Sequence, residues 1–368
     1  MMTPTQDIRW MRYAIALARR GRGRTAENPA VGCVIVQKNY VVGVGWTADG
    51  GRPHAETEAL ARAGDRAKGA TVYVTLEPCS HYGKTPPCAR ALTRAQVKRV
   101  VVATLDEDRR VSGRGVAMLQ QAGILVTLGV CAQEAAETHA GFMRRVRTGL
   151  PQVSVKIATS KDEKITKHTA QPWITGVQAR NFGHILRREH HAIVTGIGTV
   201  LADNPMLNCR LAGLEHTSPV RVIIDRQLRM PLDANVVRTA TQIPTWIVTS
   251  ITQQEHPHGV LLQKMGVQMI YVHKGDFAEV LQALGAKGIT SILVEGGQGI
   301  TEAALASGCV QQCYWFEAQH RIGAHAMPAV LHKDGLWHYL QGWQCRETML
   351  WENGDSMRLL CLQESSHI

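Results

Sequence analysis

Short apolar strands alternate with helices along almost the whole chain, and this alternation constrains the fold more than any other feature of the sequence. The strand-like runs are rich in Val and Ile, whereas the helix-like runs repeat apolar residues every three or four positions. Chains of this kind fold into layered α/β domains. We expect strands at 31–36, 40–45, 71–76, 98–105, 124–128, 152–159, 191–197, 220–225, 245–250, 268–272 and 291–295.

Two domains are expected, because 368 residues exceed what one ordinary hydrophobic core organises. A basic segment punctuated by Gly and Pro, "RRVRTGLPQ", separates the halves, so we place the domains at residues 1–148 and 149–368. In the first, "VGCVIV" and "YVVGVG" predict a β-hairpin, and a helix is expected from Pro53 to Ala63. The second restarts with "QVSVKIAT" and predicts a Rossmann-like sheet.

The composition favours a globular protein in a reducing compartment. It is 45% hydrophobic and 19% charged, and no apolar run approaches the ~20 residues of a membrane span. The basic N-terminus lacks the apolar core of a signal peptide, so we expect a cytoplasmic protein with no membrane partner. Nine cysteines then predict thiols or metal ligands. Core-filling roles are expected for Cys33, Cys131, Cys309 and Cys313.

The net charge of +11 does not identify a partner. Lys and Arg are spread along the whole chain without a dense block, so a nucleic acid and a small phosphorylated substrate both remain open from charge alone.

The most specific chemistry belongs to His54, Cys79 and Cys88. His54 opens the expected helix, whereas Cys79 and Cys88 flank the loop that follows the strand "TVYVTL". Tetrahedral zinc with one open position takes three protein ligands and a water, whose pKa falls to about 7. We therefore expect His54, Cys79 and Cys88 to bind Zn²⁺.

Glu56 is then available as a general acid and base. Residues two apart on a regular helix point about 200° apart, so we expect His54 and Glu56 to converge at the first turn, with Pro53 at the first helical position. There Glu56 would take a proton from the activated water and deliver it to a leaving amine. Two plainer interpretations stay open, namely helix capping alone and a structural zinc site closed by His81.

The pattern resembles the zinc deaminases of cytosine- and adenine-type rings, H-x-E…P-C-x-x-C, although eight residues separate the cysteines here. "NPAVGCVIV", "HAETEAL", "TLEPCSHYGKTPPC" and "SGRG" occur in one order and spacing. With them the chain is similar to the bifunctional diaminohydroxyphosphoribosylaminopyrimidine deaminase/5-amino-6-(5-phosphoribosylamino)uracil reductases of riboflavin biosynthesis. The long loop between the cysteines is that family's form of the motif. The second half carries the family's "TVLADNPMLNCR" and "LVEGGQG".

This resemblance implies a cytidine-deaminase-like three-layer α/β/α domain followed by a dihydrofolate-reductase-like α/β domain. The first domain would hydrolyse the 2-amino group of 2,5-diamino-6-ribosylamino-4(3H)-pyrimidinone 5′-phosphate and release ammonia. Asn28 and Lys84 would contact this substrate. Asp108 departs from the family pattern, which has Asn at that position.

In the second half, "SILVEGGQGI" predicts a strand, an acid, glycines and a helix. Backbone N–H groups at such a turn can cradle a phosphate, although a tight turn explains the glycines equally well. The resemblance implies hydride transfer from NADPH to the ribosyl C1′, which opens the ribose to a ribityl chain. The positions implied for NADPH are Ala158, Trp173, Thr199, Asp203, Gly297, Gln298, Gly299, Ile300, Thr301, Glu302 and Ala303. The positions implied for the substrate are Arg187, Leu207, Arg210 and Glu295.

The second half departs from the family pattern at several positions. Gln171 replaces a substrate-binding Ser but keeps its hydrogen-bonding capacity. Arg226 replaces a Ser and would favour the 2′-phosphate of NADPH. Glu163 replaces a Gly, and a left-handed backbone there would strain it. The run around Gln319 lacks the family's Asp-Glu pair and proline.

We therefore expect a riboflavin-biosynthesis enzyme that uses Zn²⁺ and NADPH on a small phosphorylated pyrimidine. We expect the chain to form a homo-oligomer and to have no nucleic-acid partner. Two rival hypotheses remain: a zinc deaminase that acts on nucleic acid, and a deaminase whose second domain is a non-catalytic scaffold.

Overall fold

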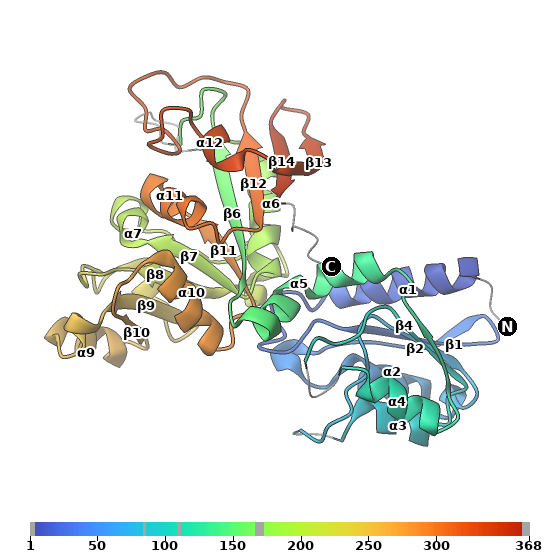
Figure 1. Ribbon diagram of the computed structural model, residues 1–368. Coiled ribbons are helices and arrows are strands. Elements are labelled where there is room, and N and C mark those ends of the chain that lie inside the picture. Colours follow the sequence, from blue (N-terminus) through green and yellow to red (C-terminus); the bar gives the residue numbers. More distant parts are fainter. Residues whose placement is uncertain (1–3, 84–85, 109–111, 166–172, 363–368) are drawn as a thin grey trace. The chain divides into compact units, whose positions relative to one another are not determined.

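The computed structural model describes residues 4–83, 86–108, 112–165 and 173–362 (Figure 1). The chain forms two compact units, Met1–Leu150 and Pro151–Ile368, which divide two residues beyond the boundary expected from the sequence. Among the described helices, none combines the length and the apolar character that crossing a bilayer requires.

The first unit is built on a five-stranded sheet in the order β2-β1-β3-β4-β5. The predicted hairpin is confirmed, because β1 and β2 pair antiparallel. β3 joins β1 antiparallel, and β4 and β5 continue in parallel. The strands are β1 (Gly32–Gln37), β2 (Tyr40–Trp46), β3 (Thr71–Val74), β4 (Arg99–Val102) and β5 (Leu125–Leu128).

Helices cover both faces of this sheet (Figure 1). Tyr73 and Val101 pack with α1 (Pro4–Arg19) and α5 (Ala132–Thr148). Their strand neighbours face the other way, toward α2 (Ala55–Ala63), α3 (Cys88–Arg94) and α4 (Arg114–Gln121). Alternate strand residues point to opposite faces, so both faces of the sheet are apolar. The three-layer α/β/α arrangement expected for this domain is confirmed.

The expected start of the helix at Pro53 is wrong by two residues. α2 begins at Ala55, and Pro53 lies before it, joined to Arg52 by a cis peptide bond. His54 is the residue that precedes the helix and has an extended backbone, with φ −72° and ψ 157°. A non-helical residue at this position does not follow the 100° rotation of a helix. That extended backbone, and not a frayed first turn, lets the side chains of His54 and Glu56 converge.

The second unit contains a nine-stranded sheet in the order β10-β9-β8-β7-β11-β6-β12-β14-β13. From β10 to β12 all neighbours are parallel, as the sequence predicted for its α/β half, whereas β14 and β13 are antiparallel. The strands are β6 (Gln152–Thr159), β7 (Ala192–Gly196), β8 (Val220–Ile224), β9 (Thr245–Ser250), β10 (Gln268–Val272), β11 (Ser291–Glu295), β12 (Gln312–Glu317), β13 (Gln344–Leu350) and β14 (Ser356–Cys361).

Seven helices accompany this sheet within the described residues. They are α6 (Val177–Glu189), α7 (Ile197–Asp203), α8 (Asn235–Arg238), α9 (Pro257–Lys264), α10 (Phe277–Ala286), α11 (Gln298–Ala306) and α12 (Trp337–Leu340). β11 lies between β7 and β6, so the chain reverses its lateral direction there. Ligands of open α/β sheets bind outside the carboxyl ends of the strands at such a point.

Candidate active sites

The three predicted metal ligands meet in the first unit. His54 precedes α2, Cys79 lies in the loop after β3, and Cys88 is the first residue of α3. The His54 Nδ1 lies 3.3 Å from the Cys88 Sγ and 3.7 Å from the Cys79 Sγ. One donor atom from each side chain lies within 4.8 Å of the other two. His81, considered as a fourth ligand, is not part of this group.

These donors fit zinc. Zn–S bonds of about 2.3 Å and Zn–N bonds of about 2.0 Å place tetrahedral ligand atoms roughly 3.5 Å apart. The observed spacing of nitrogen and sulfur is of that size. A hydrogen bond from Cys88 lowers the pKa of Cys79 to about 4, while the same bond and burial raise the pKa of Cys88. Both sulfurs bind metal as thiolates, so a cation at this site would replace the thiol proton.

Glu56 lies beside this group, in the first turn of α2, and is only 3% exposed. Burial, followed by the negative charge of Cys79, raises its pKa to about 7. A carboxyl group titrating near neutral pH can both accept and donate a proton under working conditions, which suits it to general acid–base chemistry.

Glu77 supports the metal site and was missed in the sequence. Its buried carboxylate accepts hydrogen bonds from the backbone N–H groups of Gly113 (2.9 Å) and Val116 (3.1 Å), at the start of α4. A Cβ on Gly115 would collide with the carbonyl oxygen of Pro78. The run "SGRG" therefore closes against "LEPC", and α4 fixes the loop that carries Cys79. The sequence did contain a signal for this contact: Glu77 closely follows a strand, and the glycine-rich run "SGRG" comes later in the chain.

His139 of α5 also supports the strand end that precedes Cys79. Its ring is buried, and its Nε2 lies 3.2 Å from the carbonyl oxygen and 3.1 Å from the Oγ1 of Thr75. Burial lowers the pKa of His139 to about 4, so the ring is neutral at physiological pH.

The candidate substrate contacts of this unit are placed in part. Asn28 lies in the turn where its backbone N–H donates to the carbonyl of Thr25 (3.0 Å), with its side-chain amide against Gly51. Gly51 lies three residues before His54, so Asn28 borders the segment that carries the first zinc ligand. Lys84 lies outside the described residues. The Asp108 backbone N–H donates to the Asp106 side chain at 2.8 Å.

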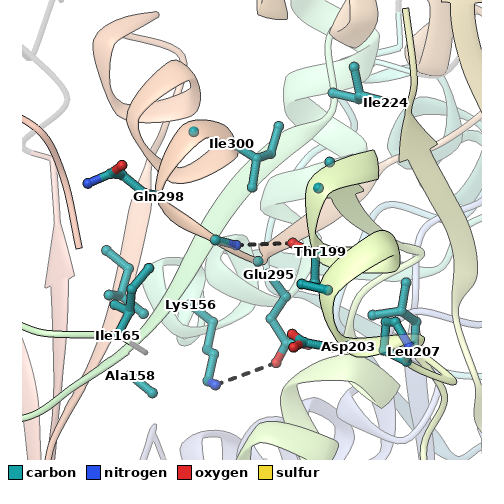
Figure 2. Close-up of a pocket in the computed structure, with 18 of the residues that line it drawn as sticks. Lys156, Ala158, Ile165, Thr199, Asp203, Leu207, Ile224, Glu295, Gln298 and Ile300 are labelled. Carbon is teal, nitrogen blue, oxygen red and sulfur yellow. Dashed lines mark hydrogen bonds and ion pairs between the residues drawn. The ribbon is translucent and has the colours of Figure 1, made fainter. Parts of the chain in front are cut away.

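A cavity of about 1770 Å³ opens in the second unit. Its walls come from the carboxyl ends of β6, β7, β8 and β11 and from the helices that follow. Figure 2 shows the side chains of Lys156, Thr199, Glu295 and Gln298 gathered around it. The volume suits a dinucleotide and a second ligand together, since sites for drug-sized ligands occupy about 300–1,000 Å³.

Most of the candidate reductase residues line this cavity. Thr301 is buried in α11, and Glu302 accepts hydrogen bonds from the Leu331 backbone and the Tyr339 hydroxyl, so neither lines it. Gln171 lies outside the described residues. The candidates that line the cavity are Ala158, Trp173, Arg187, Thr199, Asp203, Leu207, Arg210, Arg226, Glu295, Gly297, Gln298, Gly299, Ile300 and Ala303.

Lys156 and Arg187 converge on Glu295 at the floor of the cavity. The Lys156 Nζ lies 3.8 Å from Glu295 Oε1, and the Arg187 Nη2 lies 2.6 Å from Oε2. Burial opposes the charge of Glu295, but the two cations hold its pKa below the usual value. Burial and the nearby Arg187 lower the pKa of Lys156. The sequence did not identify Lys156, because one Lys inside an apolar strand has no signature of its own.

The glycine run after β11 forms a tight turn against α7. A Cβ on Gly296 would meet the hydroxyl oxygens of Thr195 (2.6 Å) and Thr199 (3.0 Å). The Gly297 N–H donates to the Thr199 Oγ1 at 3.2 Å, and α11 begins at the next residue. The turn therefore presents the N-terminus of a nine-residue helix to the cavity. Helix N-termini of this kind bind phosphate.

The departures from the family pattern are accommodated by local contacts. Glu163 has the left-handed backbone expected to strain it, with φ 56°, and its carboxylate accepts a hydrogen bond from the Leu336 N–H at 3.0 Å. Arg226 lines the cavity and donates to the Gly275 carbonyl. Gln319 donates to the Gly354 carbonyl at 2.7 Å, between β13 and β14.

Comparisons with known proteins identify both domains. Residues 4–104 match the cytidine and deoxycytidylate deaminase zinc-binding region, and residues 151–346 match the RibD C-terminal domain. The riboflavin biosynthesis protein RibD of Bacillus amyloliquefaciens is 41% identical over 330 residues, which cover 89% of this chain and 88% of the relative. That of Escherichia coli is 40% identical over 336 residues, covering 87% and 90%.

Solved structures agree over the full length. RibD of Acinetobacter baumannii is 36% identical and superposes with a TM-score of 0.87, covering 98% of this chain and 100% of that one. A diaminohydroxyphosphoribosylaminopyrimidine deaminase/5-amino-6-(5-phosphoribosylamino)uracil reductase of Thermotoga maritima is 29% identical, with a TM-score of 0.85 and coverage of 98% and 99%.

Proposed function

The chain belongs to the RibD family of riboflavin-biosynthesis proteins, and from this membership we propose which of its residues carry out the two reactions. It is a bifunctional enzyme, with a pyrimidine deaminase domain and a ribosyl reductase domain. Its cofactors are zinc in the first domain and NADPH in the second. We assign these domains to the two compact units, residues 1–150 and 151–368, and propose 2,5-diamino-6-ribosylamino-4(3H)-pyrimidinone 5′-phosphate as the substrate.

In the deaminase domain, His54, Cys79 and Cys88 hold the zinc. When bound there, zinc supplies a Lewis acid that activates water for attack on the ring carbon bearing the 2-amino group. Glu56 accepts a proton from the attacking water and donates it to the departing ammonia. Its pKa of about 7 supports this role, because both protonation states are accessible at neutral pH.

Asn28 and Lys84 are the proposed substrate contacts of this domain. The Asn28 amide lies against Gly51, close in sequence to His54, and can both donate to and accept from a pyrimidine ring. Lys84 belongs to the loop between the two zinc thiolates, where an ammonium group would meet the substrate phosphate.

In the reductase domain, Lys156 donates the proton that the ribose ring oxygen needs as the ring opens. When bound, NADPH supplies the hydride that reduces C1′. The lowered pKa of Lys156 makes it a better donor than an ordinary lysine, and Glu295 holds its ammonium in place. Together these groups give one hydride and one proton, which is the balance that the ring opening requires.

We assign different roles to Arg187 and Arg210. Arg187 pairs with Glu295 and donates to the Asn208 carbonyl at 3.0 Å, so it positions the carboxylate. Arg210 is exposed and contacts the neutral Asn208 side chain at 3.0 Å, so its charge is available for the substrate phosphate. Leu207 would pack against the pyrimidine, and Gln171 keeps its assignment as a substrate contact.

For NADPH, we assign the pyrophosphate to the turn at Gly297 and the start of α11, next to Thr199. Arg226 is assigned to the 2′-phosphate, because its guanidinium lines the same cavity from the end of β8. The remaining assignments to the cofactor are Ala158, Trp173, Asp203, Gln298, Gly299, Ile300 and Ala303, whereas Thr301 and Glu302 do not line the cavity and are not assigned.

Two observations carry the proposal. In the first domain, the His54, Cys79 and Cys88 group lies beside Glu56. In the second, a cavity contains the partly buried Lys156 paired with the buried Glu295. The test is metal analysis of the purified chain together with both half-reactions on the phosphorylated pyrimidine. Ammonia release without NADPH oxidation would favour the scaffold hypothesis for the second domain. Salt-sensitive deamination of RNA, with no turnover of the pyrimidine, would favour the nucleic-acid hypothesis.

Two further assignments concern the state of the protein in the cell. We assign it to the cytoplasm, a reducing compartment, because two of its cysteines are assigned as zinc ligands. We also expect self-association, because β13 is a largely exposed strand at the edge of its sheet, and unpaired edges favour pairing with another chain. Sedimentation of the purified chain tests the second assignment.

A further inference from the structure

A second group of metal-ligating side chains lies in the reductase domain, on the segment before α12 and in α12 itself. His332, Asp334 and His338 each place one donor atom within 4.8 Å of the other two. Across the described ranges, this group and the zinc ligands of the deaminase domain are the two that meet this criterion. His332 is partly buried, whereas Asp334 and His338 are exposed, so an ion can reach them from solvent.

The spacing of these donors suits one metal ion. The rings of His332 and His338 are almost parallel, at 12°, with centroids 3.4 Å apart. The His332 Nδ1 lies 3.8 Å from the Asp334 Oδ2. Two nitrogen ligands of one tetrahedral ion, each about 2.0 Å from it, lie roughly 3.3 Å apart. Because a metal ion lies in the plane of each imidazole that binds it, the two rings would tilt out of this stacked arrangement to bind a common ion.

The segment that carries the group is anchored on both sides. The Leu331 N–H donates to the Glu302 carboxylate at 3.3 Å, and the Tyr339 hydroxyl donates to the same oxygen at 3.0 Å. Between them, the Leu336 N–H donates to Glu163 at 3.0 Å. These contacts hold His332 and His338 near each other before any ion binds, which reduces the entropy lost on binding.

We propose that His332, Asp334 and His338 bind a divalent transition-metal ion of the zinc or nickel class, with water completing its coordination. Two imidazoles and one carboxylate, without a thiolate, favour borderline cations such as Zn²⁺, Ni²⁺ and Cu²⁺. This site is independent of both proposed reactions, since none of the three residues is a ligand of the deaminase zinc or lines the reductase cavity. Its donors are two nitrogens and one oxygen, which distinguishes it from the thiolate site in the deaminase domain.

Calorimetric titration with Ni²⁺ tests the site, using the full-length chain without a histidine tag and loaded with one equivalent of zinc, which fills the thiolate site and leaves the second site empty. A zinc-sensitive dye reports any displacement of zinc from the deaminase domain. We expect the wild-type chain to bind one equivalent of Ni²⁺ without releasing zinc. The exchanges His332→Ala and His338→Ala should each abolish this binding. His216→Ala removes an exposed histidine of the same domain and should leave binding unchanged.

Circular dichroism and retained NADPH affinity establish that each variant is folded. The proposal is overturned if the wild-type chain binds no nickel beyond zinc exchange. It is equally overturned if His338→Ala binds as tightly as the wild type, because the ion then lies elsewhere. Cobalt provides a spectral check, since an ion held by nitrogen and oxygen adds no thiolate-to-metal charge-transfer band.

Discussion

Lys156 and Glu295 lie opposite each other on the adjacent parallel strands β6 and β11, and their charged atoms are 3.8 Å apart. The pair is fixed by backbone register, because partners in a parallel sheet point to the same face. Glu295 closes β11 just before the glycine turn, so the same strand places the acid beside the lysine and the turn beside the cofactor site.

Replacement of this lysine should separate the two activities of the chain. We expect Lys156→Met to lower the rate of NADPH oxidation by about 10²- to 10⁴-fold, the usual contribution of a general acid, and to leave ammonia release unchanged. Both half-reactions are measured on the same preparation. Lys287→Met removes an exposed lysine after α10 and serves as the control. Full reductase activity in Lys156→Met would rule out its assigned role.

Glu56→Gln should retain zinc and lose deamination. The amide keeps the shape of the side chain but cannot accept the proton, so we expect ammonia release to fall by at least about 10²-fold. Zinc content is measured by elemental analysis alongside the rate. Glu58→Gln, in the same helical turn and paired with Arg62 at 2.9 Å, is the matched control. Equal losses in the two variants would indicate a fault in folding, and the assignment would fail.

His139 should make the deaminase domain less stable in mild acid. Its folded pKa of about 4 lies below the ordinary value of 6.5, so between these pH values the unfolded chain binds the extra proton. Stability therefore rises with pH in this window, and at pH 5 the loss is about 2 kcal/mol. Urea unfolding at pH 7.5 and pH 5 measures it. The stability advantage of the wild type over His139→Gln should shrink at pH 5.

The control for that measurement is His216→Gln, because His216 is exposed and shows no such burial. Its difference from the wild type should not change with pH. A pH-independent difference for His139→Gln as well would mean that the ring is protonated equally in the folded and unfolded states.

Glu163 and Gly335 should be energetically coupled. Gly335 has a left-handed backbone with φ 65°, and a Cβ there would collide with the Glu163 carboxylate. We expect Gly335→Ala to destabilise the wild type by about 1–3 kcal/mol more than it destabilises Glu163→Gly, in which the carboxylate is absent. Chemical denaturation of the four chains gives the coupling free energy. A coupling free energy near zero would show that the segment around Gly335 adjusts to the added Cβ without a loss of stability.

The sequence predicted the zinc ligands and most strands, because each depends on local information. His54, Cys79 and Cys88 are rare residue types at informative spacing, and the apolar strands are bounded by turn residues. α5 was not predicted, since it buries only Ala135, His139 and Met143 along 17 residues. Such a helix is held mainly by tertiary contacts, which the periodicity of a mostly polar segment does not reveal.

Features that depend on pairing across the fold were also missed. β12 to β14 were not predicted, and the exposed strand β13 has no apolar alternation to identify it. Lys156 gains its significance only when β6 lies beside β11. His332 and His338 are brought into contact by a turn, and no sequence pattern indicated that their rings stack. Cys33 and Cys313 are fully buried, as expected for core residues, whereas Cys131 and Cys309 are only partly buried.

The hydrogen bonds that Glu77 accepts from Gly113 and Val116 link the zinc site to α4, a helix that supplies none of the zinc ligands. Substitutions around Ser112 should therefore change the affinity of the deaminase domain for zinc. Screens for weakened zinc retention should include this turn, which is distant from Cys79 in sequence but packs against its loop. Substitutions there should cause loss of the ion rather than misfolding.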